Sequence, residues 1–166
     1  MQNNRESRSK RSEMLLWSIA FPGFGQLLNA HYIKGLSLIA LEFIVNVQGN
    51  FNTIIVLSYH GKIQEAIEQT NYQWLMFYPC LYFFAIWDAY RGVGGGTKPY
   101  SFMPFVFSAY FVTLGLIFSP KLTLFGVLIG PMWLPILFLP IGIVVGFIIQ
   151  FIMLKVKSDE TGGRVE

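Results

Sequence analysis

Residues 22–35 read PGFGQLLNAHYIKG, and the rest of the chain is interpreted outward from this stretch. One apolar run leads into it and a longer one follows it. Pro22 has no amide N–H and clashes with the preceding turn, so a helix that enters the stretch should kink or end there. Gly23 and Gly25 allow backbone segments to approach closely. The stretch therefore predicts the bend of a membrane hairpin.

The composition indicates an integral membrane protein. Of the 166 residues, 54% are hydrophobic, 17% are aromatic and only 13% are charged. Soluble domains carry about 25% charged residues, and half of that leaves too little polar surface to cover a globule in water. Lys and Arg residues cluster beside the apolar segments, which is typical of flanks that face anionic lipid, so the net charge of +3 does not indicate a nucleic-acid-binding protein.

Apolar segments predict the membrane crossings. They cover residues 36–59, 74–90, 102–118 and 122–154. We expect the last segment to divide at Gly130-Pro131 and Pro135 into a short interfacial or re-entrant piece and a final span over 137–154. The first segment carries polar residues toward its end, so a span that ends near Val47 with a wet continuation is the alternative there.

The N-terminal apolar run is too short to cross before its bend. Residues 14–21 rise only about 12 Å, less than half of a hydrocarbon core of about 30 Å. We therefore expect residues 14–35 to form a bent re-entrant or interfacial element. The expected fold class is an all-α integral membrane protein with about four transmembrane helices plus this bent N-terminal helix.

Basic residues orient the predicted spans. The tail 1–13 and the turn that holds Arg91 and Lys98 are basic, and the polar tail 155–166 carries Lys155, Lys157 and Arg164. The loop 60–73 is slightly acidic. The positive-inside rule then places both termini in the cytoplasm, with one membrane domain over 14–154 in a plasma membrane. We expect the tail 1–13 to be disordered. A full crossing by 14–30, giving five spans, is the alternative.

Polar and conformationally special residues in or beside the apolar segments are the candidate functional or partner-binding residues. They are Pro22, Gly23, Gly25, Gln26, Asn29, Lys34, Glu42 and Asp88. We expect the two amides to satisfy the carbonyl that Pro22 leaves unpaired. We expect Lys34 to extend toward lipid headgroups, and Asp88 to pair with Arg91 three residues later.

Glu42 is the most informative of these residues. A carboxyl group within a span costs on the order of 2.5–3.5 kcal/mol unless it is protonated or paired. It therefore predicts either a proton site, a cation site or a docking group for a basic partner, or a packing residue bonded to Asn46 one turn later. Both interpretations stay open at the level of sequence.

Other residues carry weaker expectations. Gly142 and Gly146 have the GxxxG spacing that permits close helix packing. Cys80, the single cysteine, is expected to be a buried thiol. The sequence offers no nucleophile–base pair, no metal-ligand spacing and no paired catalytic carboxylates, so we expect neither an enzyme nor a bound cofactor.

The pattern PGxGQxxNxxYxKG at 22–35, followed by a span and then by Trp87-Asp88, resembles small bacterial multi-pass membrane proteins whose first hairpin is similar to the two-transmembrane-helix (TM-two) domain. This resemblance covers about the first half of the chain and implies a membrane hairpin but no reaction. The same stretch is also similar to the start of sugar-type ABC permeases. Glu65-Ala66 stands without the rest of the permease docking loop, so a complete permease is not expected.

The function expected from the sequence is structural or regulatory. The chain would act as a non-enzymatic accessory, scaffold or regulatory subunit through helix–helix contacts. Its partners would be the lipid bilayer and another membrane protein or a second copy, without nucleic acid. The alternative is a small transporter or permease component with a polar path around Glu42.

Overall fold

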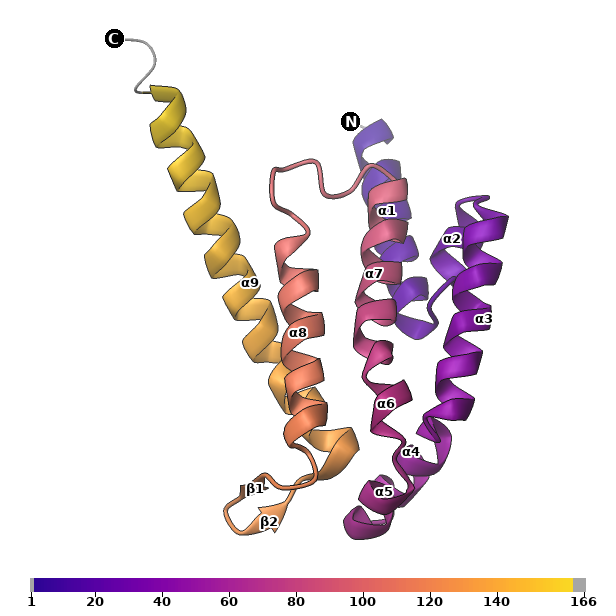
Figure 1. The fold of residues 1–166 in the computed structure, drawn as a ribbon. Coiled ribbons are helices and arrows are strands. Elements are labelled where there is room, and N and C mark those ends of the chain that lie inside the picture. Colours follow the sequence, from indigo (N-terminus) through magenta and orange to yellow (C-terminus); the bar gives the residue numbers. More distant parts are fainter. Residues whose placement is uncertain (1, 163–166) are drawn as a thin grey trace.

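The chain folds almost entirely into helices (Figure 1). The computed structural model describes residues 2–162, with side chains at positions 9–10 and 12–158. The helices are α1 (Gln2–Ala20), α2 (Phe24–Leu28), α3 (Tyr32–Gln48), α4 (Phe51–Tyr59), α5 (Ile63–Gln69), α6 (Tyr72–Leu75), α7 (Phe77–Gly92), α8 (Met103–Phe118) and α9 (Gly130–Gly162). Strands β1 (Thr123–Leu124) and β2 (Val127–Leu128) form a small antiparallel hairpin before α9. The predicted all-α class is confirmed.

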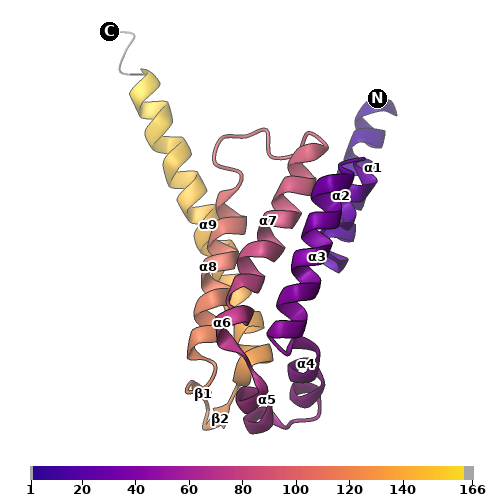
Figure 2. The same cartoon turned by 45° about the vertical axis from the view of Figure 1, so that its right-hand side comes forward.

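The beginning of α1 and the end of α9 lie at the same end of the molecule in both views (Figures 1 and 2). We call this the termini end, and the end that holds α5 and the β1–β2 hairpin the opposite end. Helix α1 runs from the termini end and turns back before it reaches the opposite end (Figure 1). Helix α2 returns toward the termini end, and α3, α7, α8 and α9 then run alternately between the two ends.

The bend after α1 lies where the sequence predicts it. Helix α1 ends at Ala20, and Gly23 has a φ angle of 101°. A Cβ atom at Gly23 would lie 2.7 Å from the carbonyl oxygen of Gly35, so glycine is required both by the backbone angle and by the contact with α3. The predicted disordered tail 1–13 is wrong for residues 2–13, which continue α1. This segment contains no proline or glycine and is rich in Arg, Lys, Glu and Gln, which favour helix.

The expected span 36–59 is broken in the structure. Helix α3 ends at Gln48, and α4 leaves it at an angle of 60°. Gly49 closes α3, and Asn50 adopts a left-handed φ of 57°, a conformation that Asn tolerates better than most residues. The observed end of α3 therefore agrees with the alternative boundary near Val47.

Helix α9 corrects the expected division of the last apolar segment. A boundary does lie at Gly130-Pro131, but α9 begins there and not at the expected start of the final span at residue 137. The helix continues through Pro135 and Pro140 without a break. Pro131 lies in the first turn, where a missing N–H leaves no intrahelical bond unmade. Pro135 packs against Gly115 of α8. The contact is so close that a Cβ atom at Gly115 would lie 2.7 Å from the Cα atom of Pro135. Tertiary contact thus keeps the helix intact where the sequence pattern predicts a break.

Few large side chains are enclosed, and many apolar ones are exposed. Within residues 2–162, one helix stretch, Gly130–Ser158, is long and apolar enough to cross a membrane, and the bent pair α3–α4 would provide a second if it counts as one span. Only 11% of the most apolar window of that stretch is buried. A compact cluster of Ile54, Ala66, Leu75 and Leu116 joins α4, α5, α6 and α8 near the opposite end.

Candidate functional site

Four of the candidate residues from distant parts of the sequence meet at one place. Gln26 and Asn29 on α2 and the following turn, together with Lys34 in the first turn of α3, contact the last turns of α7 around Asp88. We call these four residues the polar cluster. It lies toward the termini end, where α2, α3 and α7 come together (Figure 1).

Gln26 is the buried centre of the polar cluster, with 1% of its surface exposed. Its Nε2 atom donates to the carbonyl oxygen of Ala85 at 2.8 Å and to Oδ2 of Asp88 at 3.2 Å. Both partners are acceptors, which fixes the orientation of the amide group. Its Oε1 atom is buried without a hydrogen-bond partner. The side chain therefore binds α2 directly to the backbone and side chains of α7.

Asn29 and Lys34 complete the connection. Asn29 Nδ2 donates to the carbonyl oxygen of Ala89 at 3.2 Å, and Lys34 Nζ lies 2.9 Å from Oδ1 of Asp88. The long-range Lys34–Asp88 ion pair therefore replaces the expected Asp88–Arg91 pair. Lys34, which we expected to extend toward lipid headgroups, instead points to α7. The two amides likewise bind α7 carbonyls and not the carbonyl freed by Pro22.

A hollow of about 290 Å³ lies beside the polar cluster. The side chains of His31 and Arg91 line it together with the four cluster residues. Lys34 and Arg91 are exposed, whereas Asp88 is only partly exposed. The lining of the hollow thus includes two cationic groups, one carboxylate and two amides. It is a polar site beside helices whose other faces are apolar.

Pro22 and the neighbouring glycines position the polar cluster through packing. Pro22, Gly23 and Gly25 are all buried. A Cβ atom at Gly25 would collide with Ser18 Oγ on α1 and would lie 2.7 Å from Cβ of Ala89 on α7. The bend therefore sits tightly between α1, α3 and α7, which brings Gln26 within reach of the α7 carbonyls.

Glu42 lies away from the polar cluster, on the buried face of α3. Its side chain is 5% exposed and is hydrogen-bonded to Tyr78 of α7, while its Oε2 atom has no partner. The expected bond to Asn46 is not the one observed, since Asn46 Nδ2 instead faces Asn52 Oδ1 at 3.4 Å. Sequence reasoning missed Tyr78, because only tertiary packing brings α7 alongside α3.

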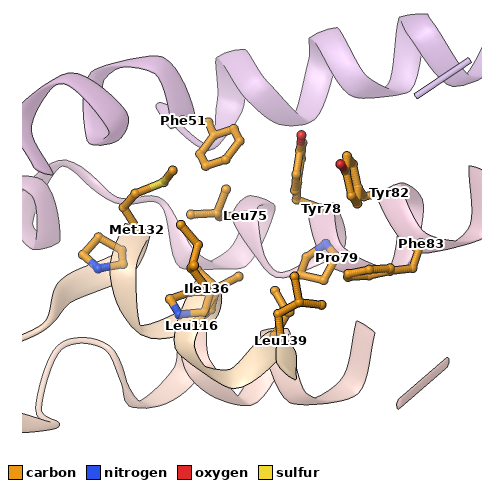
Figure 3. A pocket seen from close by; sticks show the side chains of 13 residues that line it. Phe51, Leu75, Tyr78, Pro79, Tyr82, Phe83, Leu116, Met132, Ile136 and Leu139 are labelled. Carbon is orange, nitrogen blue, oxygen red and sulfur yellow. The ribbon is translucent and has the colours of Figure 1, made fainter. Parts of the chain in front are cut away.

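Tyr78 and Tyr82 also border an apolar cavity of about 150 Å³ between α7 and the pair α8–α9 (Figure 3). Their hydroxyl groups point away from Leu116 and Leu139 in this cavity (Figure 3). The Tyr82 hydroxyl donates to the carbonyl oxygen of Ile19 at 2.6 Å, which ties α1 to α7. Helix α7 is therefore the common support of α1, α2 and α3.

Gly142 and Gly146 lie on the face of α9 that meets α8. A Cβ atom at Gly142 would lie 2.7 Å from the carbonyl oxygen of Phe107, and one at Gly146 would collide with the backbone of Pro104. The two helices therefore approach with backbone against backbone. Cys80 is exposed, which corrects the prediction of a buried thiol. It is the fourth residue of α7 and lines a hollow of about 410 Å³ between α7 and α8.

The described side chains form no group of three or more His, Cys, Asp or Glu residues that could hold a metal ion. No family model, curated protein or solved structure matches the chain. The arrangement of side chains is thus the basis for the functional argument. What the polar cluster can do chemically is donate and accept hydrogen bonds and hold one ion pair, which suits attachment of helices or recognition of a small polar group.

Proposed function

We propose that this chain is a multi-pass protein of the bacterial plasma membrane with both termini in the cytoplasm. The exposed apolar surface supports this, because large side chains on α3, α8 and α9 have no covering partner within the described chain. The termini end also carries Lys34, Arg91, Lys98 and Lys155, as the positive-inside rule requires of a cytoplasmic face.

In this proposal the chain crosses four times. The crossings are α3 with α4, α6 with α7, α8, and α9, and the α1–α2 hairpin is a re-entrant element that enters from the cytoplasmic side and returns to it. The support is that α1 turns back before the opposite end (Figures 1 and 2). A five-span chain would need α1 to reach the outer face.

Cysteine accessibility tests this topology. In a Cys80→Ala background, single cysteines at His31, Glu65 and Thr97 are probed on intact cells with a reagent that does not cross the membrane. We expect labelling at Glu65 alone, since α5 lies at the opposite end from the other two positions. Labelling at His31 contradicts the re-entrant hairpin and supports a complete first crossing.

We further propose that the protein is a non-enzymatic accessory or scaffold subunit. The observation that carries this proposal is the outer face of α9. Its upper part leans away from the other helices in both views (Figures 1 and 2), and the apolar side chains on this outer face are exposed. They are Ile141, Val144, Ile148, Phe151 and Ile152. A free apolar helix face of this length suits a second membrane helix.

Photo-crosslinking in native membranes tests the scaffold proposal. A photoreactive residue at Phe151 should give one protein adduct of defined mass. The matched control is Phe118, which is also exposed but ends α8 at the opposite end of the molecule. Lipid adducts alone at both positions would contradict a partner on the outer face of α9.

A transport component with a polar path around Glu42 is the second candidate function, favoured by a buried carboxyl group with one unpaired oxygen. Glu42→Gln separates the two functions, because it keeps the shape and the hydrogen bond to Tyr78 but removes the proton site. A scaffold should retain its partner contact and function with Gln at this position. A proton-coupled path should lose function while the variant still inserts at wild-type levels. Glu42→Leu removes the hydrogen bond as well and reports the packing contribution.

A further inference from the structure

One hollow in the described part of the chain is a groove that no part of the proposed function uses. It has a volume of about 760 Å³ and lies between α1 and α7 on one side and α8 and α9 on the other. On α9 it is lined by Leu139, Ile143, Phe147 and Gln150. We call it the α1–α9 groove. Its volume is in the range of sites that hold a small molecule.

The four α9 residues follow one helical stripe. Successive side chains are four, four and three residues apart, which places them on one face of the helix. The outer face that includes Ile148 and Ile152 is on the opposite side of α9, since each residue turns the helix by about 100°. The groove and the centre of the proposed partner surface therefore lie on different sides of α9.

The groove changes from apolar to polar along its length. Leu139, Ile143 and Phe147 line the groove together with Ile19 of α1, whereas Gln150 lines it beside the loop that holds Lys98, toward the termini end. Among the described residues that line the groove, Lys98 is the only one with a charged side chain. Gln150 Nε2 lies 3.4 Å from the carbonyl oxygen of Pro99, so the polar mouth is formed jointly by α9 and the 93–102 loop.

The depth of the groove matches one leaflet of a bilayer. From Leu139 to Gln150 the helix rises about 16 Å, at roughly 1.5 Å per residue. Half of a hydrocarbon core is about 15 Å thick. A molecule that fills the groove would thus have an apolar tail about one leaflet long and a head group beside a lysine.

We infer that the α1–α9 groove binds one acyl chain of an anionic phospholipid from the leaflet at the termini end, with the lipid phosphate at Lys98. The chain lies along Ile143 and Phe147, and the positive charge at the mouth selects an anionic head group over a zwitterionic one. A lysine near the membrane surface favours an anionic lipid by a factor of about five.

Native mass spectrometry of the full chain in neutral detergent, with added phosphatidylglycerol or phosphatidylcholine, tests this inference. We expect one phosphatidylglycerol to be retained about fivefold more strongly than phosphatidylcholine. Lys98→Gln should remove that preference. The control Lys121→Gln, an exposed lysine at the opposite end, should leave it unchanged.

A second pair of variants tests the position of the acyl chain. Ile143→Trp fills the groove and should lower the retention of both lipids at least about tenfold, because the indole ring blocks the apolar surface that the acyl chain would contact. The control Ile148→Trp places the same ring on the outer face of α9 and should retain lipid normally. Thermal unfolding of each variant reports whether it is folded. If Ile143→Trp is unstable, the lipid preference of Lys98→Gln, a change at an exposed side chain, decides whether the groove binds an anionic lipid.

Three outcomes would overturn the inference. Equal retention of the two lipids by the wild type would remove the role of Lys98. Lipid retention that survives Ile143→Trp in a folded protein would place the lipid elsewhere. A lipid-free dimer that Ile143→Trp dissociates would instead assign the groove to a second copy of the chain.

Discussion

The contact between α2 and α7 and the contact between α8 and α9 join helices in opposite ways. In the first, polar side chains reach from α2 to backbone carbonyls and to a carboxylate on α7. In the second, Gly142 and Gly146 allow the backbones of two apolar helices to touch. Polar attachment depends on a few atoms with defined directions, whereas glycine packing depends on the absence of side-chain volume. The two contacts should therefore fail under different substitutions.

Gly146→Leu should have the largest effect, because the new side chain would occupy the space of the α8 backbone at Pro104, which has no flexible end to move aside. We expect the free energy of unfolding to fall by about 3 kcal/mol, the upper end for overpacking. Gly146→Ala should show a smaller loss in the same direction. Reversible unfolding in mixed micelles measures both.

Val144→Leu is the matched control for this contact. It enlarges an exposed position on the same helix, two residues away, and should change stability by less than about 0.5 kcal/mol. If Gly146→Leu lowers stability no more than this control, α8 and α9 do not pack backbone against backbone, and the proposed contrast with the polar α2–α7 contact is wrong.

Gln26→Leu should have an intermediate effect. It removes the donor to Ala85 and Asp88 in a buried place, which costs about 2 kcal/mol for the acceptor groups left without a partner. Gln48→Leu, at an exposed amide near the end of α3, is the matched control and should be nearly neutral. Limited proteolysis at the α1–α2 bend measures whether the hairpin is released. An unchanged cleavage rate would show that packing at Gly23 and Gly25 holds α2 without the amide.

Asp88→Asn should have the smallest effect of the three. The Lys34 side chain is 59% exposed and that of Asp88 is 23% exposed, so solvent screens the ion pair and its removal should cost about 0.5–1 kcal/mol. A double-mutant cycle with Lys34→Gln isolates the coupling energy, which added salt should weaken. Lys62–Glu65, an i,i+3 pair on α5 with both side chains more than half exposed, is the control and should show less coupling. Equal coupling in the two pairs would show that Asp88 has no special place in the polar cluster.

The comparison also explains which parts of the structure are predictable from sequence. Local backbone chemistry predicts the bend at Pro22-Gly23 and a boundary at Gly130-Pro131, which is where α9 begins. It does not predict the uninterrupted path through Pro135, because the contact with Gly115 that supports it comes from another helix. An end of the first span near Val47 is only an alternative at the level of sequence, because no local sequence signal requires the left-handed φ that Asn50 adopts.

The candidate site also has parts that the sequence predicts and parts that only tertiary packing determines. Gln26, Asn29, Lys34 and Asp88 stand out in the sequence as polar residues beside apolar segments. Their partners do not, because two of the acceptors are the backbone carbonyl oxygens of Ala85 and Ala89. Sequence spacing favoured the nearby Asp88–Arg91 pair, and the structure has the distant Lys34–Asp88 pair. Residue type can identify the members of such a site, but helix docking determines how they are paired.

The distance along the chain between the partners of the polar cluster has a consequence for biosynthesis. The hydrogen bonds of Gln26 and Asn29 connect residues 59 to 62 positions apart, so these two side chains lack their polar partners until the second half of α7 has left the ribosome. The hairpin is therefore made first but anchored late, after α3 and α7 have been synthesised. Until then the amide of Gln26 needs water or another group as its hydrogen-bond partner, and a pause in translation after Gly92 would give the hairpin time to dock before α8 and α9 follow.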